Sequence, residues 1–263
     1  MTTVRTRFYD SLRDREIEEY LDRSDIILLP VGTIEMHGEM PVGCEHVLPL
    51  AIALKMAEQV DGLVLPNLPY FYAGATAIGR GTLQVPPSAG SAYLRAICSS
   101  LLRQGFRRQI LLSTHGPAYT TVAPLVREFF DETKCPIVYI DFESYYGSYS
   151  WDDFNKMLWG AYDILGRLEE IPRDQRPSER TYPKAIVTGR FHVGGYYEKP
   201  SDHGWGPDHP LSDPERAARA EEGKAMIEKM LLGVDPPTLV AKMKELDAYL
   251  QTQVLPKYRD HLP

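Results

Sequence analysis

The sequence from Ile26 to Gly38 reads Ile-Ile-Leu-Leu-Pro-Val-Gly-Thr-Ile-Glu-Met-His-Gly, and Gly-Cys-Glu-His follows at residues 43–46. The aliphatic run at its start predicts a buried β-strand, which the proline and glycine after it would end. Four potential metal ligands then fall within twelve positions: Glu35, His37, Glu45 and His46. Carboxylate and imidazole groups at the carboxyl end of a buried strand are what a catalytic metal site needs. The stretch therefore predicts a core strand and part of a metal site.

Strand-like and helix-like segments alternate along the rest of the chain. Further strands are predicted at 62–66, 108–114, 135–141 and 184–189, and helices at 11–22, 48–60, 91–104, 117–133, 152–170, 213–232 and 237–254. Such alternation is typical of a three-layer α/β/α fold, in which helices cover both faces of a mostly parallel sheet. We expect residues 1–263 to form a single domain, because a chain of this length can bury one full core.

Composition and charge argue against a nucleic-acid-binding protein and against a membrane protein. The net charge is −7 and the acidic residues are dispersed, so no basic face is available for nucleic acid. No stretch has the length and apolarity of a membrane span, and the start of the chain has no apolar signal core. The three cysteines, Cys44, Cys98 and Cys135, form no CxxC pair and leave one unpaired in any disulfide scheme. We therefore expect a cytoplasmic protein that binds neither nucleic acid nor membranes.

Two later segments are predicted to complete the site. His115 follows the strand predicted at 108–114, just as Glu35 follows the first strand. In a parallel sheet the carboxyl ends of both strands lie at one edge, where ligands bind in folds of this class. The segment 69–87 is long, aromatic and rich in Gly and Pro. Loops of that length are usually functional or disordered, and its apolar content argues against disorder.

These motifs resemble those of the creatininase (creatinine amidohydrolase) family. Residues 29–38 are similar to the family's first motif, LPxGSxEQHG, which places Glu35 and His37 on metal-ligand positions. Gly-Cys-Glu at 43–45 stands where the family has Gly-Thr-Asp, so Glu45 takes the position of an Asp that bridges two metals. The resemblance implies a creatininase-like α/β fold.

The later motifs resemble the family in the same order. Gly81-Thr-Leu is similar to its PGT segment and Gly105-Phe-Arg-Arg to its GFRR-type segment. Ser-Thr-His-Gly-Pro-Ala at 113–118 stands where NGHGGN is usual, which places His115 on a ligand position. Phe-His-Val-Gly-Gly at 191–195 resembles HAGE, with His192 on the position of the catalytic histidine.

The chain departs from the family at the second metal. The family completes that site with a Glu at one of two positions, which here hold Pro117 and Gly195, and neither side chain can bind a metal. Glu198 is the first candidate replacement; the alternatives are His46, Asp202 and His203. The favoured arrangement is one metal held by Glu35, Glu45 and His115, with His37 as a further ligand or as a ligand of a second metal.

The resemblance implies a hydrolase that uses one or two divalent ions, zinc or manganese, with one ion favoured. Metal-activated water would attack the ring carbonyl of a small, polar cyclic substrate and break the C–N bond of a cyclic amide, with His192 and Glu45 in catalytic roles. Three alternatives stay open. The first is C–C hydrolysis of a cyclic keto-polyol, the second is a metal-poor binding or scaffold protein, and the third is a metal-free isomerase or lyase that uses His192 and Glu45. The family also implies a homo-oligomer, with a hexamer favoured.

Overall fold

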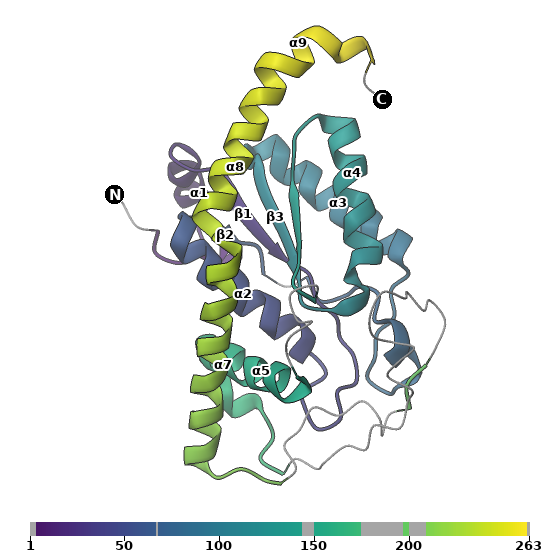
Figure 1. Ribbon diagram of the computed structural model, residues 1–263, viewed down its shortest axis with the longest axis vertical. Helices are drawn as coiled ribbons and strands as arrows, with labels where there is room; N and C mark the ends of the chain where they lie inside the picture. The colour runs from purple at the N-terminus through teal and green to yellow at the C-terminus, as the bar shows by residue number, and fades with distance from the viewer. Residues whose placement is uncertain (1–3, 67, 144–149, 175–196, 200–208, 262–263) are drawn as a thin grey trace.

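The centre of the protein is a parallel sheet with the strand order β2-β1-β3-β4 (Figure 1). The computed structural model describes residues 4–66, 68–143, 150–174, 197–199 and 209–261. The strands are β1 (Ile26–Pro30), β2 (Leu63–Val64), β3 (Arg108–Ser113) and β4 (Val138–Asp141). These four were predicted from the sequence; the fifth, at 184–189, falls outside the described residues.

Helices precede, connect and follow these strands, as the alternating pattern predicts. The α-helices are α1 (Asp14–Leu21), α2 (Cys44–Val60), α3 (Pro87–Gln104), α4 (Tyr119–Thr133), α5 (Trp151–Ile164), α7 (Asp213–Val234), α8 (Pro236–Tyr249) and α9 (Leu255–Tyr258). A π-helical turn, η7 (Leu250–Val254), joins α8 to α9. The 3₁₀ turns are η1 (Tyr9–Ser11), η2 (Gly74–Ile78), η3 (Gly116–Ala118), η5 (Leu168–Glu170) and η8 (Arg259–His261).

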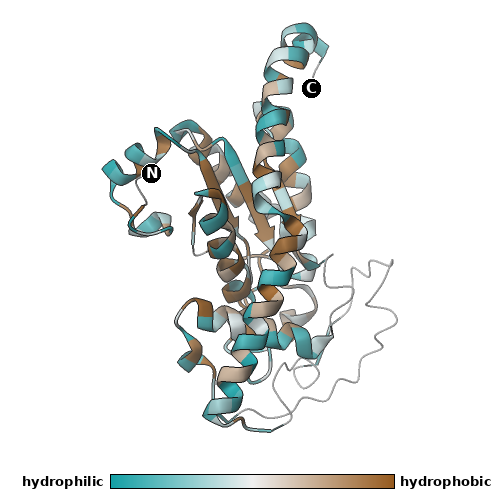
Figure 2. Ribbon diagram, turned by 60° about the vertical axis from the view of Figure 1, so that its left-hand side comes forward, coloured by the Kyte–Doolittle hydropathy of each residue, from teal (hydrophilic) through white to brown (hydrophobic). Residues whose placement is uncertain are grey.

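The sheet separates two hydrophobic cores. Along β1, Ile26 and Leu28 pack with α2, α5, α7 and α8, whereas Ile27 and Leu29 pack on the opposite face with α1, α3 and α4. Every residue of β1 is buried, which explains why its sequence is uniformly apolar instead of alternating. In Figure 2 the strands are largely coloured as hydrophobic, whereas the helices beside them carry both hydrophilic and hydrophobic residues. The fold is therefore the predicted three-layer α/β/α arrangement.

The start of helix α2 differs from the prediction in a way that affects the site. Helix α2 begins at Cys44 and not at residue 48, so Pro49 lies inside the helix and does not start it. Glu45 accordingly belongs to the first turn of a helix, whereas the sequence pattern had placed it in a loop. The helix predicted at 152–170 ends earlier, at Ile164, and the left-handed Gly166 (φ 68°) follows.

Helices α5 and α7 cross at two glycines. A Cβ added to Gly223 would overlap the backbone carbonyl of Lys156, and one added to Gly160 would overlap the backbone of α7. The two helices can therefore approach this closely only with glycine at both positions. Among the described helices, none is long and apolar enough to cross a membrane.

Candidate metal centre

The site forms where β1 and β3 end at the same edge of the sheet. After β1 the backbone at Gly32 packs against His46, in the first turn of α2. The approach is so close that a Cβ at Gly32 would come within 2.6 Å of the His46 Cα atom. The Glu35 N–H then bonds the Val42 carbonyl at 2.9 Å, which closes the loop that carries Glu35 and His37. His115 lies two residues after the end of β3, and Glu45 points in from the first turn of α2.

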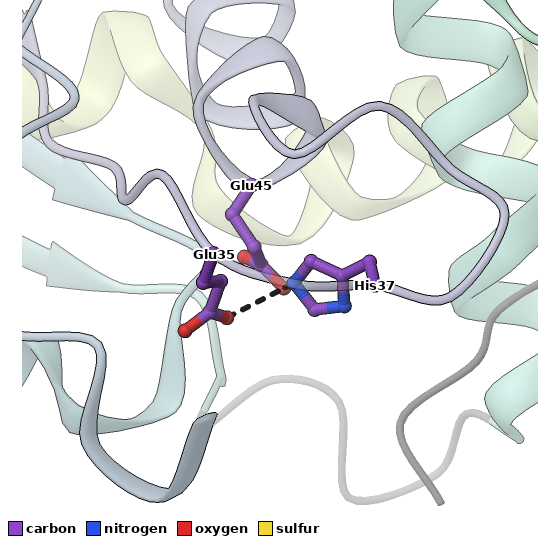
Figure 3. Close-up of side chains that lie close together, drawn as sticks. All are labelled: Glu35, His37 and Glu45. Atoms are coloured by element: carbon purple, nitrogen blue, oxygen red, sulfur yellow. Dashed lines mark hydrogen bonds and ion pairs between the residues drawn. The ribbon is translucent and has the colours of Figure 1, made fainter. Parts of the chain in front are cut away.

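Glu35, His37 and Glu45 converge in the interior (Figure 3). Nε2 of His37 lies 2.9 Å from Oε1 of Glu35 and 3.2 Å from Oε1 of Glu45. The three residues are only 1–3% exposed. His115 approaches the same group, with Nδ1 3.5 Å from Oε1 of Glu35 and 3.9 Å from Oε2 of Glu45.

This donor set fits a divalent metal ion. Zinc-type bonds of about 2.1 Å place neighbouring ligand atoms about 3.0 Å apart at octahedral angles and about 3.4 Å apart at tetrahedral angles. The closest approaches of His37 and His115 to the carboxylates are 2.9, 3.2 and 3.5 Å, close to that range. In addition, Oε2 of Glu45 is buried and has no hydrogen-bond partner among the described residues. A buried carboxylate oxygen in that state is stable only with a cation or proton nearby.

The electrostatics of the cluster favour opposite charges in the absence of a metal. Burial acts to raise the pKa of Glu35, but the neighbouring His115 and the hydrogen bonds from His37 and Thr76 outweigh it and lower that pKa to about 2. Burial acts to lower the pKa of His37, but its interactions with Glu35 and Glu45 raise it to about 9. A metal ion would therefore replace the proton that His37 holds near neutral pH.

Two hydrogen bonds orient the ligand atoms. Nε2 of His115 lies 3.0 Å from the carbonyl oxygen of Tyr72, and because a carbonyl can only accept, Nε2 carries the hydrogen. In the neutral ring, Nδ1 then presents its lone pair to the carboxylates. The hydroxyl of Thr76 donates to Oε2 of Glu35 at 2.7 Å, so Oε1 is the oxygen that faces His37.

Comparison with known proteins identifies the family. The family model described as "Creatininase: Creatinine amidohydrolase" matches residues 10–234. The chain belongs to the creatininase family. Its identity to individual members is low, so it is a divergent member.

Two curated relatives are similar over part of their length. The chain is 30% identical over 142 residues to a 3-dehydro-scyllo-inosose hydrolase from Thermotoga maritima, covering 53% of this chain and 45% of that protein. It is 30% identical over 115 residues to a creatinine amidohydrolase from Pseudomonas putida, covering 41% of this chain and 44% of that protein. The matched region thus spans less than half the length of each relative.

Solved creatininases share the fold. A crystal structure of creatinine amidohydrolase superposes with a TM-score of 0.66 at 20% identity, covering 91% of this chain and 98% of that chain. Two others are described as a creatininase of "Zn-Zn type" (TM-score 0.62) and as "Creatininase Mn" (TM-score 0.65); each is 17% identical and covers 87% of this chain, and 98% and 99% of its own chain respectively. These likenesses confirm the predicted creatininase-like fold.

The structure brings four of the predicted site residues together. Glu35, His37 and Glu45 form the tightest group, whereas the favoured arrangement had His115 in place of His37. Glu198 is buried, and its backbone N–H bonds the Ala75 carbonyl at 3.0 Å, but it is not a member of the three-residue group. His192, and the alternatives Asp202 and His203, lie outside the described residues.

Sequence reasoning missed Tyr72 and Thr76, which contact the candidate ligands directly. Neither belongs to a motif that resembles the family, and a backbone carbonyl leaves no trace in a sequence. The available signal was the composition of the 69–87 segment, which indicated a functional loop without indicating a residue.

Proposed function

We propose that this creatininase-family chain is a divalent-metal-dependent hydrolase that opens a small cyclic substrate by attack of water on a ring carbonyl. The observation that carries the proposal is the buried Glu35-His37-Glu45 cluster, with Nδ1 of His115 at 3.5 Å from Glu35. Both curated relatives carry hydrolase names. Zinc and manganese are the proposed metals, since solved creatininases include forms described with each.

The residues have separable roles in this proposal. Oε1 of Glu35, Nε2 of His37, Oε1 of Glu45 and Nδ1 of His115 would hold the ion. When bound, a divalent metal supplies Lewis-acid polarisation of the carbonyl and lowers the pKa of water. Oε2 of Glu45, which is buried without a hydrogen-bond partner among the described residues, accepts the proton of the attacking water. His192 is the proposed donor to the leaving group.

The first candidate substrate is a cyclic amide. Water adds its oxygen to the carbonyl carbon, the C–N bond breaks, and the ring nitrogen takes a proton, which leaves a carboxylate and an amine on one open chain. Support comes from the family's description and from the Pseudomonas putida relative, both of which are named for creatinine hydrolysis.

The second candidate is a cyclic keto-polyol. Here water adds to a ring ketone, the adjacent C–C bond breaks, and the departing carbon takes a proton as the ketone carbon becomes a carboxylate. The match to the inosose hydrolase favours this candidate, because it extends over 142 residues, against 115 for the creatinine amidohydrolase.

The test is an activity panel combined with metal removal. Protein purified without chelator is offered cyclic amides and cyclic keto-polyols, and ring opening is followed by mass spectrometry as the addition of one water. We expect turnover of one class, its loss after exhaustive chelation, and its return with zinc or manganese. Turnover that survives chelation would instead support a metal-free isomerase or lyase, and protein that holds well under one equivalent of metal would support a scaffold. Glu35→Gln is the control variant.

A further inference from the structure

One short segment contacts two candidate metal ligands, Glu35 and His115, which follow different strands. Residues 72–76 follow β2 and end in η2. At the start of this segment the Tyr72 carbonyl accepts a hydrogen bond from Nε2 of His115 at 3.0 Å. At its end the Thr76 hydroxyl donates to Oε2 of Glu35 at 2.7 Å, and both of these side chains are only 2% exposed. Residues from two different strand ends are thereby fixed to the same piece of backbone.

The segment is itself held by contacts outside the metal cluster. The Ala73 and Gly74 N–H groups donate to Oε1 of Gln84 at 3.1 and 3.2 Å. Gly74 has a φ of 79° and packs against Pro117, so that a Cβ there would lie 3.0 Å from Cγ of that proline. Glycine adopts this positive φ without strain, and η2 begins at the same residue. The segment is therefore held in part by residues that are not candidate metal ligands.

The two hydrogen bonds determine which atoms face the centre. The bond to Tyr72 occupies Nε2 of His115 and leaves Nδ1, while the bond from Thr76 occupies Oε2 of Glu35 and leaves Oε1. We infer that residues 72–76 are the positioning element of the metal centre, and that Thr76 is a positioning residue that presents Oε1 of Glu35 to the metal. This inference rests on the metal site of the proposed function.

A purely structural role for Thr76 makes a different prediction. In that case the hydroxyl only satisfies a buried carboxylate, and its removal changes stability while the native protein binds metal as before. Thr121 in α4 provides a matched control, because it is also buried, at 1% exposure, and its hydroxyl has no hydrogen-bond partner among the described residues. Thr→Val at either position removes one hydroxyl from the interior.

The experiment is a titration of metal-free protein with Mn²⁺, in which electron paramagnetic resonance measures the free ion. Loss of a hydrogen bond that orients a metal ligand weakens metal binding by about 10- to 100-fold. We expect Thr76→Val to bind Mn²⁺ about 10- to 100-fold more weakly than wild type, and Thr76→Ser and Thr121→Val to bind it with near wild-type affinity. Equal Mn²⁺ affinity in Thr76→Val and wild type would overturn the inference. Failure of the wild type to bind Mn²⁺ or Zn²⁺ would instead overturn the proposed function.

A second variant applies if Thr76→Val does not fold. The Gln84 side chain lies outside the metal cluster, so Gln84→Met loosens the segment without touching a candidate ligand. We expect its Mn²⁺ affinity to fall by at least about threefold, a fraction of the effect of losing a direct bond to a ligand. Unchanged affinity in this folded variant would overturn the inference.

Discussion

Nε2 of His37 lies 2.9 Å from Oε1 of Glu35, and both side chains are almost completely buried. With the pKa of Glu35 lowered to about 2 and that of His37 raised to about 9, the metal-free pair is a carboxylate and an imidazolium at pH 7. The nitrogen that would bind a metal therefore carries a proton in the metal-free protein. Metal and proton compete for one atom.

This competition predicts that metal binding releases protons. At pH 7, uptake of one Zn²⁺ should release about one proton from His37, and the release should decline as the pH rises past about 9, where His37 is already neutral. Isothermal titration calorimetry in two buffers with different ionisation enthalpies measures this quantity. A binding enthalpy that is the same in both buffers at pH 7 would show that no proton leaves.

The same pair predicts how the stability of metal-free protein depends on pH. The pKa of His37 is raised from 6.5 to about 9, so its contribution to stability is complete below pH 6.5 and is lost as the pH rises through 9. The contribution of Glu35 is complete above its unfolded pKa of 4.5, so it is constant in that range. The melting-temperature advantage of wild type over His37→Gln should shrink from pH 6 to pH 9. A constant or growing advantage would contradict the assignment.

The strands and helices could be predicted from the sequence because short runs of neighbouring residues indicate them. The aliphatic run Ile26–Leu29 predicts β1, and Gly105 ends α3 where the pattern indicated. The predicted start of α2, at residue 48, was four residues too late. Proline is common in the first turn of a helix, so Pro49 indicated a start beside it, but Pro49 lies deeper in the helix.

The candidate site was predictable only in part. Glu35, His37 and His115 follow strands, so parallel topology places them together. The distances from each histidine to the two carboxylates differ by less than an ångström and depend on details of side-chain packing. A sequence pattern therefore does not indicate that His37, and not His115, completes the tightest group. The contribution of Tyr72 comes from its backbone carbonyl, which every residue type has, and no sequence pattern indicates it.

Glu45→Gln should separate proton transfer from metal binding. The amide oxygen can still coordinate a metal, but the side chain can no longer accept a proton from water. At saturating metal we expect kcat to fall by about 10²- to 10⁴-fold, the usual contribution of a general base. The measurement is turnover per bound metal ion, with metal content determined on the same sample. Turnover per ion near that of wild type would remove Glu45 from the proton-transfer role.

Gly223→Ala tests the close crossing of α5 and α7. The new methyl group would overlap the Lys156 carbonyl, so we expect a loss of about 1–3 kcal/mol in the free energy of unfolding. Gly233→Ala in the same helix is the control: among the described residues, and apart from the adjoining backbone of α7, no atom lies within 4 Å of its added Cβ. This variant should be neutral or stabilise by up to about 1 kcal/mol. Urea denaturation of metal-free protein gives both values. Equal stability of the two variants would contradict the observed packing.

Metal content tests directly whether the buried Glu35-His37-Glu45 cluster holds a divalent metal. The most direct measurement is the metal content of protein purified without chelator and incubated with Zn²⁺ or Mn²⁺, then freed of excess ion and analysed by mass spectrometry. We predict at least one equivalent per chain in wild type and a loss of that equivalent in a Glu35→Gln/His37→Gln double variant. Well under one equivalent in wild type, or equal content in the double variant, would contradict it.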